Sequence, residues 1–221
     1  MILFILGSGA SVDSHLPTYR DDTSQRIEEV LHVNSLTNKE RYNTLVQFVQ
    51  NFKTHVKQSI IGETYRILEE IFRTNEGDII TQNIDGMINR IDIKANIVQV
   101  HGDLRTRCQN SMCENVGEEW ECELCGERCR PNMVLYGEEL DKEVKKSLSI
   151  ISRKRYEWLV IVGTTLQFEY LSHIVNKCKK RGTRVVCINP NDACDCKEWI
   201  KMPSREGLEY FKDSYLNGLK K

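Results

Sequence analysis

The sequence predicts an α/β fold built on a doubly wound parallel sheet, with a helical insertion and a small zinc-ribbon module. Short apolar runs of strand length alternate along the chain with segments of helical period. This alternation is typical of parallel sheets that carry helices on both faces. Closely spaced cysteines interrupt the pattern between Arg105 and Arg130. That stretch has neither helical nor strand period, so we interpret it as an inserted metal-binding module.

The individual elements follow from the spacing of apolar residues. Residues 1–6 form an apolar run that ends at Gly7, as expected for a strand buried on both faces. Further strands are predicted at residues 78–81, 97–100, 133–136 and 158–162, with 184–188 as the last one. Helices are predicted at residues 42–52, 60–72, 142–151 and 171–180, where apolar residues recur at helical spacing.

The bulk composition is that of a globular protein, with 40% apolar and 29% charged residues in a chain of 221. The net charge is −1, from 31 basic and 32 acidic side chains, and gives no general reason to expect nucleic-acid binding. The apolar start is too short for a signal sequence, and no run is long enough to span a bilayer. We therefore expect a soluble, intracellular and cytoplasmic protein, monomeric and without membrane association.

Four of the nine cysteines have the spacing of metal ligands. Cys122-x2-Cys125, followed by glycine, is a zinc-knuckle turn, and Cys108-x4-Cys113 supplies a second pair at a looser spacing. Four thiolates with no open position describe a structural zinc site, which would fold the module rather than take part in a reaction. Cys129 is a rival to Cys125 as a ligand, and the knuckle geometry favours Cys125.

A glycine-rich loop, Gly7-Ser8-Gly9-Ala10-Ser11, follows the first strand. Its backbone could approach a pyrophosphate and donate N–H groups to the phosphate oxygens. The full dinucleotide pattern G-x-G-x-x-G is absent because position 12 is valine, so the loop alone fits a turn without a ligand equally well. The nearby Leu16-Pro17-Thr18-Tyr19-Arg20 combines a rigid proline with a ring and a guanidinium that could clamp an anion. In isolation, this segment fits a surface turn better.

Polar side chains follow two of the predicted strands. Gln82, Asn83 and Asp85 come after residues 78–81, and His101 comes after residues 97–100. Ligands of open α/β sheets bind outside the carboxyl ends of the strands. Amides there can bind ribose hydroxyls and a carboxamide, although Asn and Asp are also common in turns. His101 is a candidate base because its ordinary pKa is near neutrality, and a structural hydrogen bond is the alternative for an isolated histidine.

Taken in order, these motifs resemble those of the sirtuin (Sir2) family of NAD-dependent protein deacylases. The collinear matches run from residue 7 to residue 189. They are Gly7-Ser8-Gly9-Ala10-Ser11, Leu16-Pro17-Thr18-Tyr19-Arg20, Thr81-Gln82-Asn83-Ile84-Asp85, His101-Gly102, the four cysteines, Arg130-Pro131-Asn132-Met133-Val134-Leu135-Tyr136-Gly137-Glu138, Gly163-Thr164-Thr165-Leu166 and Ile188-Asn189.

The resemblance implies a role for each motif, with NAD+ and one structural Zn²⁺ as cofactors. His101 would be the general base, and Gln82, Asn83 and Asp85 would complete the catalytic group. An extended acyl-lysine peptide would lie beside Met133, Val134, Tyr136, Gly137 and Phe168. The NAD+ site would comprise Gly7, Ser8, Gly9, Ala10 and Ser11 at the pyrophosphate, Pro17, Thr18, Tyr19 and Arg20 in a loop over the cofactor, Gln82, Asn83, Ile84 and Asp85 at the ribose and nicotinamide, and Gly163, Thr164, Thr165 and Asn189 at the adenosine half.

The resemblance also implies the organisation of the chain as a single sirtuin-type catalytic domain over residues 1–221. Residues 1–23, 73–104 and 131–221 would form the Rossmann-like core. Residues 24–72 would form the helical insertion, and residues 105–130 the zinc-binding module. The expected partner is an acyl-lysine protein or peptide.

The chain departs from the family pattern beside the substrate. Tyr19 replaces the usual Phe, and Phe168 and Tyr170 stand where the family usually has Val and Pro, which makes one wall of the peptide groove bulkier. No Tyr-x-x-Arg pair that could receive an acidic acyl group occurs between residues 41 and 72, so we expect a neutral acyl group such as acetyl. Two other functions stay open: an NAD glycohydrolase or ADP-ribosyltransferase with the same NAD pocket, and a non-catalytic NAD-binding scaffold.

Overall fold

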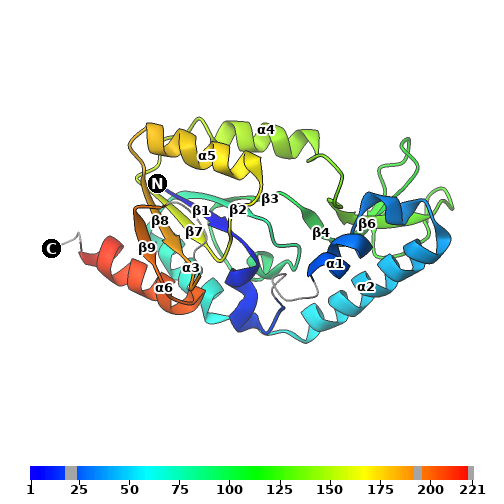
Figure 1. Ribbon diagram of the computed structural model, residues 1–221, viewed down its shortest axis with the longest axis horizontal. Helices are drawn as coiled ribbons and strands as arrows, with labels where there is room; N and C mark the ends of the chain where they lie inside the picture. Colours follow the sequence, from blue (N-terminus) through cyan, green and yellow to red (C-terminus); the bar gives the residue numbers. More distant parts are fainter. Residues whose placement is uncertain (18–23, 192–195, 219–221) are drawn as a thin grey trace.

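A parallel sheet forms the centre of the computed structural model, which describes residues 1–17, 24–191 and 196–218 (Figure 1). Its strand order in these residues is β3-β2-β1-β7-β8-β9, and each neighbouring pair is parallel. The strands are β1 (Ile2–Leu6), β2 (Gly77–Thr81), β3 (Asn96–Gln99), β7 (Trp158–Val162), β8 (Arg184–Ile188) and β9 (Glu198–Ile200).

The central strand β1 explains why its sequence is apolar without alternation. Successive side chains of a strand point to opposite faces of the sheet. Phe4 belongs to the core on one face, and Leu3 and Ile5 belong to the core on the other. All three are fully buried. A strand covered on both faces must be apolar at every position.

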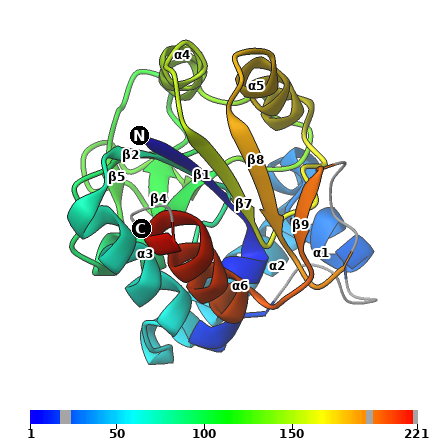
Figure 2. The same ribbon diagram turned by 90° about the vertical axis from the view of Figure 1, so that its left-hand side faces the viewer.

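Helices cover both faces of the sheet, which confirms the predicted doubly wound architecture. The helices α4 (Lys142–Ile151) and α5 (Glu169–Lys180) lie next to each other over one face (Figure 2). On the other face lie α3 (Glu63–Thr74) and α6 (Ser204–Phe211), which pack against each other. The long α2 (Lys39–Gln58) and the short α1 (Ser24–Val30) lie to one side, together with the strand β6 (Cys129–Met133). No helix in the described residues is both long and apolar enough to cross a membrane.

The metal-binding region contains a small antiparallel sheet that the sequence did not reveal. Its order is β5-β4-β6, with β4 (Gly102–Cys108), β5 (Val116–Gly117) and β6 (Cys129–Met133). The prediction that residues 105–130 lack strands was therefore wrong, and so was the strand predicted at 133–136. The strand ends at Met133 and contains Pro131, which an edge strand tolerates because it lacks only an outward N–H. Non-local pairing with β4, rather than apolar periodicity, creates this strand.

The last predicted strand is not the last one observed. β9 extends the sheet beyond β8 through parallel pairing with it. With only 3 residues, β9 is too short to show an apolar period in the sequence. The predicted division into core, helical insertion and zinc-binding module stays a prediction.

Candidate active site

The candidate site lies where β1, β2 and β7 end, at the carboxyl edge of the sheet. A cavity of about 850 Å³ opens there. Of the predicted site residues, its lining contains Gly7, Ser8, Gln82, Asn83, Ile84, His101, Met133, Val134, Tyr136, Gly137, Gly163, Thr164, Thr165 and Phe168. Residues Thr18, Tyr19 and Arg20 lie outside the described residues. The other residues predicted for catalysis or NAD binding do not line the cavity: Gly9, Ala10, Ser11, Pro17, Asp85 and Asn189.

The glycines after β1 are required by close contact with the loop after β7. A Cβ on Gly9 would lie 2.6 Å from the Cα of Gly163, and a Cβ on Gly7 would lie 2.5 Å from the Cβ of Thr164. Gly163 itself has φ +61°, which favours glycine. The backbone N–H of Gly9 donates to the carbonyl of Gly163 at 3.0 Å. The two loops therefore form one continuous wall of the cavity.

A buried network of polar side chains supports this wall. Ser11 Oγ donates to Asp85 Oδ2 at 2.6 Å and lies 2.7 Å from the hydroxyl of Tyr65. Asn83 Nδ2 donates to the carbonyl of Gly7 at 3.0 Å and to Ser11 Oγ at 3.1 Å. Burial raises the pKa of Asp85, although the hydrogen bond from Ser11 opposes the shift. Asp85 also accepts a bond from the backbone N–H of Met87 at 2.9 Å.

Tyr65 in α3 is a member of this network that sequence reasoning missed. Its helical spacing marked it only as a core residue, and it is indeed fully buried. A buried hydroxyl requires a hydrogen-bond partner, and Tyr65 finds Ser11 and, at 3.3 Å, Asn83. Burial raises its pKa above the ordinary value of 10.0. The hydroxyl is therefore protonated at neutral pH.

His101 is held by hydrogen bonds at both ring nitrogens. Its Nδ1 lies 3.0 Å from the carbonyl oxygen of Gln82, and its Nε2 lies 2.9 Å from the hydroxyl of Tyr170. Because a carbonyl only accepts, Nδ1 carries the proton in the neutral ring and Nε2 accepts from Tyr170. Burial lowers the pKa of His101 below 6.5. The imidazole is therefore neutral at pH 7, the state that a general base requires.

Two aromatic side chains enclose His101. The Phe168 ring meets the imidazole edge-on, with centroids 5.0 Å apart and an angle of 71° between the planes. The Tyr170 ring stacks on Phe168 at 5.6 Å and 22°. The sequence marks Tyr170 only as a bulky substitution. Its contact with the base could not be read from a separation of 69 residues.

The side of the cavity beyond His101 is held in shape by a buried ion pair. Arg130 in β6 pairs with Glu138, whose Oε2 also accepts from the backbone N–H of Leu135 at 2.9 Å. Burial alone would raise the pKa of Glu138, but the hydrogen bonds from Arg130 and Leu135 bring it below the usual range. The backbone N–H of Val134 donates to the carbonyl of His101 at 2.9 Å. This segment is thereby fixed against the candidate base.

Two further polar contacts join the ends of β2, β7 and β8. Gln82 Nε2 donates to Thr164 Oγ1 at 2.8 Å, and Asn189 Nδ2 donates to the carbonyl of Thr164 at 3.4 Å. Asn189 and Thr164 are both buried. The predicted nicotinamide and adenosine residues are thus connected through a single threonine.

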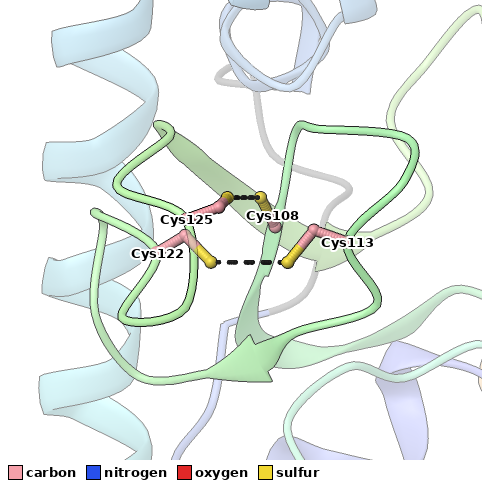
Figure 3. A group of neighbouring side chains, drawn as sticks. All are labelled: Cys108, Cys113, Cys122 and Cys125. Carbon is pink, nitrogen blue, oxygen red and sulfur yellow. Dashed lines mark hydrogen bonds between the residues drawn. The ribbon is translucent and has the colours of Figure 1, made fainter.

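Four cysteines of the small sheet approach one another as metal ligands would. The Sγ atoms of Cys108 and Cys125 are 3.5 Å apart, those of Cys113 and Cys122 are 3.6 Å apart, and all four lie within 4.8 Å (Figure 3). A tetrahedral Zn²⁺ with Zn–S bonds of about 2.3 Å separates its sulfurs by about 3.8 Å. The four thiols therefore fit this ion. Cys129 does not belong to the group, and its carbonyl accepts from Tyr42 Oη at 2.5 Å.

Comparison with known proteins places these features in a family context. Residues 7–169 match the Sir2 family. The NAD-dependent protein deacetylase of Staphylococcus epidermidis is 31% identical over 212 residues, which cover 85% of this chain and 80% of that protein. The NAD-dependent protein deacylase 2 of Pseudomonas aeruginosa is 27% identical over 207 residues, which cover 86% of this chain and 81% of that protein.

Solved structures share the fold at low sequence identity. A Sir2 homologue in complex with NAD superposes with a TM-score of 0.83 at 22% identity, covering 99% of this chain and 90% of that one. A Sir2 protein bound to an acetylated peptide superposes with a TM-score of 0.80 at 17% identity, covering 97% and 92%. The sheet, its helices and their order are therefore common to these proteins and this chain.

Proposed function

Because the chain belongs to the Sir2 family, we propose that it is an NAD-dependent protein-lysine deacylase that releases nicotinamide and O-acyl-ADP-ribose. The observation that carries the proposal is His101. The imidazole is neutral at pH 7, and it lines a cavity together with Gln82 and Asn83. The segment that would flank a peptide is hydrogen-bonded to the backbone carbonyl of His101 through the N–H of Val134.

NAD+ supplies the leaving nicotinamide and the ribose that accepts the acyl group. The acyl oxygen of the substrate would bond to the ribose carbon as the carbon–nitrogen bond to nicotinamide breaks. His101 Nε2 would then take the proton of a ribose hydroxyl, whose oxygen bonds to the acyl carbon, and water would release the lysine amine. Asn83, held by Ser11 and Tyr65, would contact the amide of nicotinamide from the cavity wall, and Asp85 would fix Ser11 behind that wall. With one water consumed, the balance is NAD+ and acyl-lysine converted to nicotinamide, free lysine and O-acyl-ADP-ribose.

The remaining cofactor contacts are assigned by position in the wall. We place the pyrophosphate at Gly7 to Ser11 and also assign Pro17, Thr18, Tyr19 and Arg20 to the cofactor, of which Thr18, Tyr19 and Arg20 lie outside the described residues. The adenosine half lies at Gly163, Thr164, Thr165 and Asn189, and Ile84 lies beside the nicotinamide. The four cysteines hold Zn²⁺ and fold the small sheet. The substrate peptide lies extended between Met133–Gly137 and Phe168, where its backbone can pair as an added strand.

An NAD glycohydrolase or ADP-ribosyltransferase is the second candidate, because it would use the same NAD pocket. The wall from Arg130 to Glu138 disfavours it, since hydrolysis of NAD needs no peptide groove. Mass spectrometry after incubation with NAD and an acetyl-lysine peptide separates the functions. O-acetyl-ADP-ribose supports the deacylase, peptide-independent ADP-ribose supports the hydrolase, and unchanged NAD supports a non-catalytic scaffold.

We also propose a cytoplasmic monomer. Four thiolates that bind zinc rather than form disulfides suit a reducing compartment. Light scattering at a mass of 25.7 kDa would support the monomer, and twice that mass would contradict it.

A further inference from the structure

The cavity that holds His101 extends past Tyr170 to the two helices above the sheet. There it is lined by Lys145 and Ser149 of α4 and by Ser152, the residue that follows α4. From α5 it is lined by Ile174 and Lys177. The two helices lie side by side in both views (Figures 1 and 2). Lys177 Nζ donates to Ser152 Oγ at 3.5 Å across the gap. Neither the predicted cofactor residues nor the predicted peptide residues include this extension.

These helices carry a basic charge that the chain as a whole does not. From residue 142 to 155 a single carboxylate, Glu143, accompanies Lys142, Lys145, Lys146, Arg153, Lys154 and Arg155. From residue 173 to 184 no carboxylate accompanies Lys177, Lys179, Lys180, Arg181 and Arg184. Because the net charge of the whole chain is −1, these two segments are basic against a negative remainder, although Lys154 is paired with the buried Asp78 and Lys146 with Glu143.

Helix stability explains only part of this charge. Cations in the last turn of a helix are favoured by its dipole, which accounts for Lys177, Lys179 and Lys180 in α5. Lys142 and Lys145 stand in the first turns of α4, where the same dipole disfavours cations. At Lys145 the ion pair with Glu139 offsets part of this cost.

Three carboxylates line the same cavity as Lys145 and Lys177, namely those of Glu138, Glu139 and Glu169. Glu138 is held by Arg130. Glu139 lies against Lys145, but that carboxylate is 88% exposed and its lysine 49% exposed. Exposed pairs of this kind contribute little and exchange readily. Glu169 stands at the other end of α5, next to the peptide groove.

We propose that this α4–α5 extension binds an acidic segment of the protein substrate, on one side of the acyl-lysine. The proposal rests on the proposed deacylase function. An extended peptide that leaves the groove between Met133–Gly137 and Phe168 would pass directly into the extension, since one cavity contains both. Lys145 and Lys177 meet its carboxylates, and Ser149 offers a hydroxyl to its backbone.

The test uses acetyl-lysine peptides that carry three Glu or three Gln residues on one side or the other of the modified lysine. Two exposed ion pairs correspond to a change of about 3- to 10-fold in KM. We expect the peptide whose Glu residues lie on the side that enters the extension to have a KM lower by this factor than its Gln counterpart. Its kcat should be unchanged. The double variant Lys145→Gln, Lys177→Gln and 0.5 M NaCl should each abolish the difference.

Lys94→Gln is the matched control, because Lys94 is exposed, precedes β3 and does not line the cavity. It should keep the preference for Glu. Equal KM values for Glu and Gln peptides in the wild type would overturn the acidic-segment proposal while leaving the deacylase intact. A DNA duplex that binds through Lys145 and Lys177 with no effect of Glu would also overturn it. Absence of NAD-dependent deacetylation of every peptide would instead overturn the proposed function.

Discussion

The hydroxyl of Tyr170 is hydrogen-bonded to the nitrogen of His101 that the proposed reaction uses. The distance from Tyr170 Oη to His101 Nε2 is 2.9 Å, and burial raises the pKa of Tyr170, so this hydroxyl stays a donor at neutral pH. In the proposed reaction, a ribose hydroxyl would have to replace Tyr170 before His101 could take its proton. The base is therefore engaged with the protein until ligands enter the cavity.

Replacing His101 should slow deacylation but leave NAD binding intact. We expect His101→Ala to lower deacylation about 10²-fold or more, the range for a lost general base, while NAD still binds. Turnover by mass spectrometry and NAD binding by calorimetry check this. The exposed His55 in α2 provides the control variant His55→Ala, and near-normal turnover by a folded His101→Ala protein would refute the role.

Removing the Tyr170 hydroxyl should change the pH dependence. Burial already lowers the pKa of His101 below 6.5. A hydrogen bond donated to Nε2 stabilises the neutral ring, so its loss in Tyr170→Phe should raise that pKa. The base is active above its pKa and is lost as pH falls through it, so the acid limb of kcat/KM should move to higher pH. The exposed Tyr210→Phe should leave the limb in place. An unchanged limb in Tyr170→Phe would contradict the assignment.

The Tyr65 network should contribute to both stability and cofactor affinity. Tyr65→Phe removes one hydrogen-bond partner of Ser11 and one of Asn83. We expect a loss of about 0.5–1.5 kcal/mol in the free energy of unfolding, as for one buried hydrogen bond, and a raised KM for NAD. Urea denaturation and steady-state kinetics measure the two effects. An unchanged KM for NAD would show that the network only stabilises the fold.

Metal content should depend on the four clustered thiols and not on the fifth. We expect one zinc per chain, lost in Cys122→Ser and kept in Cys129→Ser, because Cys129 stands outside the group of four. Elemental analysis of the purified variants tests this. Zinc lost from Cys129→Ser and retained in Cys125→Ser would reverse the choice of ligands.

Acyl preference should favour neutral groups. The expectation comes from the absence of a Tyr-x-x-Arg pair between residues 41 and 72. Competition between acetylated and succinylated forms of one peptide measures it, with kcat/KM higher for the acetylated form. A clear preference for succinyl would refute it and would point to a cation from another segment of the chain in the acyl pocket.

Local patterns were sufficient for much of the fold. The predicted helix 142–151 and the strands 158–162 and 184–188 coincide with α4, β7 and β8, because apolar period and flanking residues act within the segment itself. The knuckle around Cys122 and Cys125 is likewise a local turn. The polar residues after β2 were placed correctly at the sheet edge, because parallel strands end on the same side.

The tertiary structure alone decided which side chains meet. β6 and β9 exist through pairing with β4 and β8, and neither has a period of its own. Tyr65 reaches Ser11 across 54 residues, and Tyr170 reaches His101 across 69. Lys145 and Lys177 share a cavity only because α4 and α5 cover the same face of the sheet. Secondary structure is largely determined by neighbours in the chain, whereas partners of buried polar groups are determined by packing between distant segments.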